Sequence, residues 1–194
     1  MIMKHFYITF LIIGFIGCNN KLANKAIDGN TIENIKTNEQ KKGYLLEILE
    51  REQIEPKESI SDIILKYGKP SKAYDAYIQE NATRNGKNIK LLENYFSAFG
   101  YPKIGEVGEN AASAPWLVFL QSQNYYVKER NFIYLYRGYR SGDMKKRDFM
   151  SLLDMMYNHK FGKDFEMEGA YQGDIKIDQQ IKILGLDKQI LEIK

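Results

Sequence analysis

The chain has 194 residues, which suits one domain, and a 44% hydrophobic and 13% aromatic content that supports a buried core and excludes overall disorder. A formal net charge of +3 is too small and too dispersed to favour nucleic acid as a partner. The single cysteine, Cys18, excludes a disulfide framework. No motif in the chain calls for a cofactor.

The first eighteen residues are predicted to be an export and lipidation signal. An apolar run over residues 6–16 is followed by Gly17 and Cys18. Such a run is too short to span a bilayer, which needs about 20 residues, but it suits the apolar region of a signal peptide. A small residue before the cysteine is what a lipoprotein signal peptidase requires, so residues 15–18 resemble a bacterial lipobox, with Phe15 in place of the usual Leu.

This resemblance implies a bacterial lipoprotein. Residues 1–17 would be the signal peptide, and Cys18 would carry the acyl chains, palmitate among them, that anchor the protein in a membrane. We expect a cell-envelope protein that faces the periplasm, on the outer membrane. The alternative is an ordinary secretory signal in which the cysteine occurs by chance.

Residues 18–42 are predicted to be the lipidated cysteine and a flexible tether, because residues 19–40 hold six asparagines and few large apolar side chains. Residues 43–194 are predicted to form a single, compact, all-α domain, since no strand–helix alternation occurs. Glycine, proline and the periodicity of apolar residues delimit its helices. The predicted helices cover residues 43–55, 59–67, 73–84, 91–99, 114–122, 124–139, 143–156 and 175–183, with a last turn or two from Leu186.

Three of these segments carry finer expectations. A break is expected at Gly86, between two helices. Residues 114–122 are apolar nearly all round and predict a buried central helix. Residues 124–139 fit a strand or a helix, and the helix is favoured because Tyr125, Phe132 and Tyr139 then share one face. The expected core consists of Phe96, Phe99, Trp116, Phe119, Phe149 and Leu153.

The order of several residues resembles a family of helical bacterial domains of unknown function that are often found in lipoproteins. The residues that carry this resemblance are Asn88, the stretch from Phe99 to Pro102, Val107, Gly108, Ala112, Trp116, Gln121, Gly142, the stretch from Leu152 to Asp154, Gly162, Gly185 and Leu186. In that family a His tends to follow the Gln and an Arg tends to follow the Asp. This chain has Ser122 and Met155 at those two places, so of such a polar site it keeps Asp154 alone.

Candidate catalytic residues are few. Asp154 could act as an acid or base with Arg147 or Arg130 as its electrostatic partner. Asp154 and Arg147 lie seven residues apart on one flank of a predicted helix. A row of exposed ion pairs explains the same spacing. His159 falls at the edge of the apolar stripe and is predicted to be structural. One histidine without a free cysteine gives no metal site, and the acidic stretch after Asp164 lacks the last glutamate of a calcium loop.

Aromatic and cationic residues alternate after Gln123. Tyr126, Arg130 and Arg137 could stack on sugars or peptides in a groove, although a core face with a solvated opposite face explains most of the pattern. The sequence therefore favours a lipid-anchored, non-enzymatic binding module with an envelope protein or a glycan as its partner. The alternative is an envelope hydrolase that uses Asp154.

Overall fold

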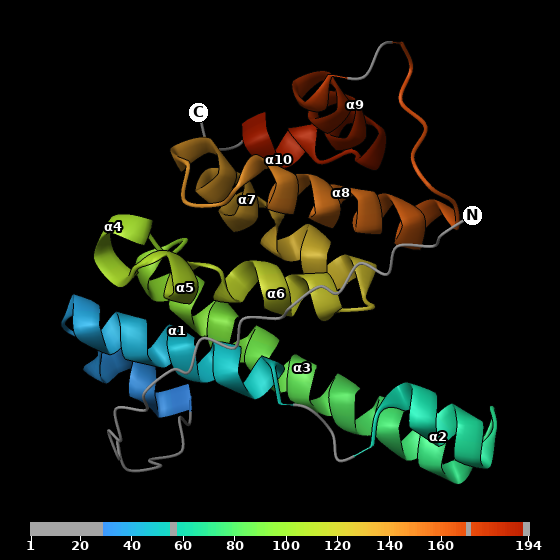
Figure 1. Ribbon diagram of the computed structural model, residues 1–194. Coiled ribbons are helices and arrows are strands. Elements are labelled where there is room, and N and C mark those ends of the chain that lie inside the picture. The colour runs from blue at the N-terminus through green and yellow to red at the C-terminus, as the bar shows by residue number, and fades with distance from the viewer. Residues whose placement is uncertain (1–28, 55–57, 170–171, 192–194) are drawn as a thin grey trace, which may run out of the picture.

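The computed structural model describes residues 29–54, 58–169 and 172–191, which form an all-α fold (Figure 1). The predicted fold class is confirmed, since these ranges contain helices and no strand. The elements are the 3-10 helix η1 (Gly29–Asn34) and the α-helices α1 (Asn38–Glu52), α2 (Ile60–Tyr67), α3 (Lys72–Phe99), α4 (Ile104–Val107), α5 (Glu109–Ala112), α6 (Ala114–Gln121), α7 (Tyr125–Ser141), α8 (Lys146–Phe161), α9 (Gly173–Leu184) and α10 (Asp187–Leu191).

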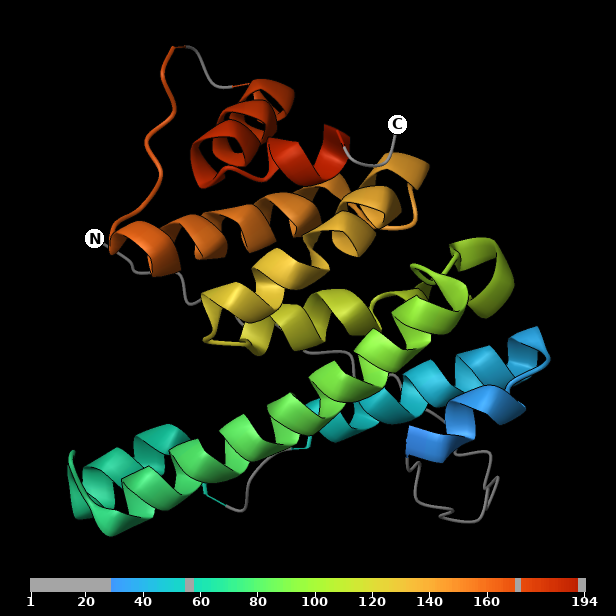
Figure 2. The ribbon, with the colours of Figure 1, turned by 180° about the vertical axis from the view of Figure 1, so that it is seen from behind.

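The longest of the described helices is α3, with 28 residues, and it runs diagonally across the lower part of the view in Figure 2. It begins at Ser71, whose hydroxyl accepts from the Tyr74 amide, and it ends at Gly100 in a left-handed conformation that suits glycine. The expected break at Gly86 is wrong, because α3 is continuous through that residue. Neighbouring helices support both halves of α3: α2 packs on its N-terminal half, and α1 and α6 pack further along.

The folded part begins earlier than predicted. Helix α1 starts at Asn38, after the capping residue Thr37, whose hydroxyl accepts from the Gln40 amide while the Gln40 side chain accepts from Thr37. Ile35 is buried in the core. Residues 38–42, the last five of the tether predicted over residues 18–42, lie in α1. The predicted lipidation site Cys18 and the predicted signal peptide lie outside the described residues.

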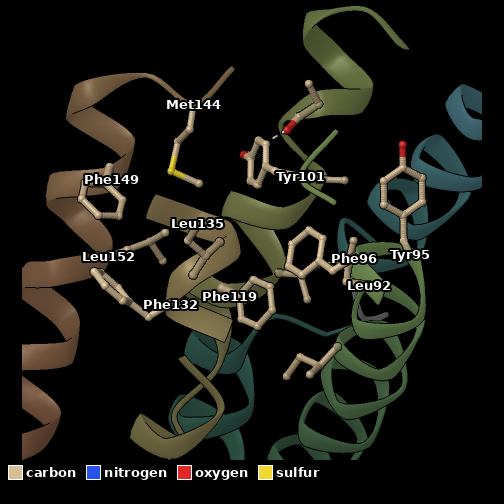
Figure 3. Packing of buried hydrophobic residues seen from close by; sticks show 14 of the residues in the cluster. Leu92, Tyr95, Phe96, Tyr101, Phe119, Phe132, Leu135, Met144, Phe149 and Leu152 are labelled. Carbon is tan, nitrogen blue, oxygen red and sulfur yellow. Dashed lines mark hydrogen bonds between the residues drawn. The ribbon is translucent and has the colours of Figure 1, made fainter. Parts of the chain in front are cut away.

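An aromatic cluster joins the helices at the centre of the molecule (Figure 3). The Phe96 ring of α3 stacks on Phe119 of α6 at 6.0 Å and on Tyr134 of α7 at 4.9 Å between ring centroids. The buried hydroxyl of Tyr101 donates to the Ala112 carbonyl at 3.3 Å, which satisfies its polar group. These contacts bind α3, α6 and α7 into one core.

The predicted core is confirmed for four of its six members. Phe96, Phe119, Phe149 and Leu153 are buried, whereas Phe99 and Trp116 are only half-buried. Helix α6 is central, as expected, but it turns the Trp116 side chain toward the edge of the core. The prediction of a helix over residues 124–139 is also confirmed by α7.

The C-terminal helices cover the outer side of this core. Helix α8 packs on α6 and α7, α9 packs on α8, and α10 returns to α7 (Figure 1). Among the described residues, no helix combines the length and the apolar character that crossing a bilayer requires.

Candidate ligand-binding cleft

A cleft of about 810 Å³ opens between the N-terminal half of α3, the α6–α7 junction and α8. Its size suits a small ligand, since ligand sites fall in the range of about 300–1,000 Å³. Tyrosines and amide side chains dominate the polar part of its lining: Tyr77, Asn81, Asn85, Gln121, Gln123, Asn124, Tyr125 and Tyr126. Among the described residues that line it, none is Asp, Glu, Lys or Arg.

The α3 wall of the cleft is fixed by a buried amide network. The Asn85 amide donates to the Glu52 carboxylate at 2.9 Å and to the Val118 carbonyl at 2.9 Å. Asn88 donates to the other Glu52 oxygen at 2.7 Å. Two charge-assisted hydrogen bonds therefore satisfy a carboxylate that is almost fully buried behind this wall.

The opposite wall is the short connection from α6 to α7. Asn124 caps α7, because its side-chain oxygen accepts from the Tyr126 amide at 2.9 Å. The Ser122 hydroxyl accepts from the Asn124 amide at 3.3 Å, which fixes the connection. Tyr126 is 72% exposed at the rim, where its ring meets Tyr125 edge to face. The wall thus presents an aromatic side chain that has few contacts of its own.

A charged lysine lies directly behind this wall. Lys128, in the first turns of α7, is 0% exposed, and its ammonium donates to the Ser122 carbonyl. Within the described chain, this neutral carbonyl is its only hydrogen-bond partner. Burial lowers the pKa of Lys128 to about 8, because the charged form loses its hydration.

His159 of α8 completes the cleft from its far side. Its Nδ1 atom is buried and has no hydrogen-bond partner among the described residues. Burial, and then the nearby charge of Lys128, lower the pKa of His159. The imidazole is therefore neutral near pH 7 and retains an unused polar atom.

The structure brings one of the three predicted binding residues into the cleft. Tyr126 lines it, whereas Arg130 and Arg137 follow along α7 and do not. Arg130 pairs with Glu93 of α3 at 2.7 Å, and Arg137 is exposed. The cationic part of the predicted groove is therefore not assembled around this cleft.

The two catalytic candidates have separate surroundings. Asp154 is bound by Lys176 at 2.7 Å and by the Gln180 amide at 2.8 Å, so its contacts link α8 to α9. Its side chain is 43% exposed and does not line the cleft. Arg147 is 84% exposed and pairs with its neighbour Asp148 at 3.4 Å.

Arg147 instead lines a second cavity of about 450 Å³ between the start of α6 and the α7–α8 turn. An ion pair between Lys145 and Glu109, both lining residues, lies at this cavity. Asp143 also lines it and is engaged by the Ile104 amide at 2.8 Å. The charged side chains of this cavity already pair with other groups of the protein, so fewer polar groups are available to a ligand there than in the cleft.

Several residues that line the cleft or lie behind its walls were not anticipated from the sequence. Lys128 lies on the buried face of α7, four residues before Phe132, and this placement in the apolar stripe was the available signal. His159 was predicted to be structural and lines the cleft. Asn81 and Asn85 carried no signal beyond their helical spacing. Within the described ranges, no group of His, Cys, Asp and Glu could hold a metal ion.

Comparisons with known proteins give no relative to guide the assignment. No protein-family model, curated protein or solved structure matches the chain.

Proposed function

We propose that the protein is a lipid-anchored, non-enzymatic binding protein of the bacterial cell envelope, and that its ligand is a glycan held in the cleft. The lining of the cleft carries this proposal. It combines tyrosine rings with amide side chains and has no carboxylate among the described residues that could serve as an acid or base.

Sugars offer two kinds of surface that this lining matches. Their C–H faces stack on aromatic rings, and Tyr126 and Tyr77 present rings along the cleft. Their hydroxyls both donate and accept hydrogen bonds, as the amides of Asn81 and Gln121 do. The apolar remainder, which includes Ile78 and Val127, leaves room for a ligand that is only partly hydroxylated.

The hydrolase alternative receives less support from the geometry. Asp154 is engaged by Lys176 and Gln180, and Arg147 lines a different cavity from the cleft. A catalytic carboxylate needs a partner or a buried setting that shifts its proton affinity toward the working pH. Turnover of an envelope substrate that Asp154→Asn abolishes would favour the hydrolase.

A binding measurement with a rim variant tests the proposal. The full chain, purified in detergent, is applied to an array of bacterial envelope oligosaccharides. We expect a defined subset to bind, and we expect Tyr126→Ala to weaken that binding about tenfold, because stacking on an aromatic ring contributes on the order of 1 kcal/mol or more.

Tyr67→Ala is the matched control, since Tyr67 is another exposed tyrosine but lies on α2 and does not line the cleft. It should leave the array pattern unchanged. Absence of binding to every glycan, or equal loss in both variants, would overturn the proposal. Capture of a single envelope protein that Tyr126→Ala releases would replace the glycan with a protein partner.

A further inference from the structure

Behind the α6–α7 wall of the cleft lies a positive charge that no carboxylate among the described residues pairs with. Lys128 is fully buried, and its ammonium, which has three donors, has the Ser122 carbonyl as its one partner in the described chain. Buried ammonium groups in proteins are normally paired with a carboxylate or with several acceptors. Here the one hydrogen bond that the cation forms within the described ranges is to a neutral carbonyl.

The helix that carries Lys128 adds to this imbalance. Helix α7 starts at the cleft, so the partial positive charge of its N-terminus lies on the same side as the lysine. Acidic residues are favoured in the first turn of a helix, and α7 has none there. A lysine four residues into the helix is electrostatically unfavourable unless an anion is nearby.

Two acids near the cleft, Glu52 and Glu129, are already engaged. Glu52 lies behind the opposite wall and receives the amides of Asn85 and Asn88. Glu129 of α7 accepts from the Tyr125 hydroxyl at 2.9 Å, and Lys160 donates to that hydroxyl at 3.2 Å. Neither carboxylate forms a hydrogen bond or an ion pair with Lys128.

We propose that the glycan in the cleft carries a carboxylate, which lies at the wall formed by Ser122 and His159 and which compensates the charge of Lys128. This inference rests on the proposed function and specifies its ligand class. The site is a cleft with neutral, hydrogen-bonding sides and a buried cation behind one of its walls.

Each residue has a distinct task in this arrangement. His159 lines the cleft, and its imidazole donates an N–H to the carboxylate. The Ser122 hydroxyl, which already accepts from Asn124, still has its proton to donate. Lys128 acts through space rather than by contact, and its attraction is strong because little water separates it from the wall. Lys128 is therefore a positioning residue for the charge of the ligand.

Matched pairs of ligands test this inference. Uronate-containing envelope oligosaccharides are arrayed beside their methyl esters, which keep the shape and remove the charge. We expect the full chain to bind the acids on the order of tenfold more tightly than the esters. We expect Lys128→Met to bind both forms about equally, because a thioether of similar length fills the same space without a charge.

Lys87→Met is the control, because Lys87 is an exposed lysine of α3 that does not line the cleft. It should keep the preference for acids. If acids and esters bind the wild type equally, the carboxylate is excluded while glycan binding stands. If the wild type binds neither form nor any neutral glycan, both proposals fail.

An NMR titration of His159 tests whether this residue contacts the carboxylate of the ligand or has a structural role alone. His159 is the one histidine after residue 18, so its ring signals in NMR are unambiguous. Saturation with the bound acid should raise the pKa of His159, since a carboxylate favours the imidazolium, and the ester should not. An unchanged His159 titration in the presence of bound acid would place the carboxylate elsewhere and overturn the inference.

Discussion

We expect Lys128 to destabilise the fold that contains it. A fully buried ammonium loses its hydration, and one carbonyl replaces only part of it. Burial of this kind lowers the pKa of Lys128 to about 8, whereas an exposed lysine titrates near 10.4. A residue that costs stability in this way is a candidate for function, because perturbed titratable groups cluster at functional sites.

Because the pKa of Lys128 is lower in the folded state than in the unfolded state, the free energy of unfolding depends on pH. Above about pH 10.5 the amine is neutral in both states, and below about pH 8 it is charged in both, so the unfolded state binds more protons only between these limits. The free energy of unfolding should therefore rise with pH across this window, by about 3 kcal/mol from Lys128 alone. At pH 7 we expect Lys128→Met to be more stable than the wild type by about 1–4 kcal/mol.

Urea unfolding of both proteins between about pH 7 and pH 10 measures this difference. The comparison cancels the titration of the tyrosines, several of which are buried. The advantage of Lys128→Met should shrink as the pH rises. A difference that is independent of pH, or a variant less stable than the wild type at pH 7, would show that the ammonium is compensated in the fold.

The sequence predicts the roles of individual residues less well than it predicts the helices. Tyr126 was identified because an aromatic residue beside cations is visible in the chain. His159 was read as structural because its position at the edge of an apolar stripe says nothing about what lies opposite. The cleft joins α3, the α6–α7 junction and α8, which lie far apart in sequence, so neither Asn85 nor His159 could be assigned to it beforehand.

Helices α3 and α7 each contain a glycine in their interior, one with open space around it and one in close contact with a neighbouring side chain. Gly86 lies in the middle of α3, and a Cβ atom there would meet no heavy atom within 4 Å. Gly138 of α7 packs directly on Tyr101, so a Cβ atom would lie 2.5 Å from two carbons of that ring. Glycine is dispensable for α3 but required for the approach of Tyr101 to α7.

Alanine at these two positions should therefore change stability in opposite directions. We expect Gly86→Ala to stabilise by about 0.5–1 kcal/mol, because glycine in a helix loses more backbone entropy on folding than alanine does. We expect Gly138→Ala to destabilise by about 1–3 kcal/mol, because the Tyr101 ring must move out of a packed core. Thermal unfolding monitored by circular dichroism at 222 nm measures both; equal shifts in the two variants would contradict the packing at Gly138.

These glycines also explain where element prediction failed. The break at Gly86 was inferred from intrinsic propensity, a weak preference that tertiary contacts routinely override. Packing of α2 on one half of α3, and of α1 and α6 on the other, holds the helix straight through that position. Helices were correctly predicted at α7 and α8, whose buried faces are continuous, although α8 begins three residues later and ends five residues later than the predicted helix over 143–156.

At the scale of the whole molecule, the cleft lies between the N-terminal half of α3 and the helices α6, α7 and α8. Helix α2 and the N-terminal half of α3 pack together and project beyond the other helices, whereas α7 and α8 lie on the opposite side of the molecule (Figures 1 and 2). The N-terminal half of α3, which includes Ile78, is mostly exposed and faces the cleft with one side. A ligand in the cleft would bridge the extended end of α3 and the compact body.

The proposed location depends on Cys18, whose thiol is the single acylation point that the sequence offers. Two acyl chains anchor a protein stably, whereas one chain gives marginal, reversible binding. Radiolabelled palmitate should therefore enter the wild-type protein expressed in bacteria and should fractionate with membranes. Cys18→Ala should take up no label and should not be processed at residue 17. Both proteins should give the same helical circular dichroism spectrum, since Cys18 lies outside the described helices, the first of which is η1 (Gly29–Asn34). Equal labelling of the two proteins would remove the lipid anchor while leaving the cleft and its ligand chemistry open to the same binding tests.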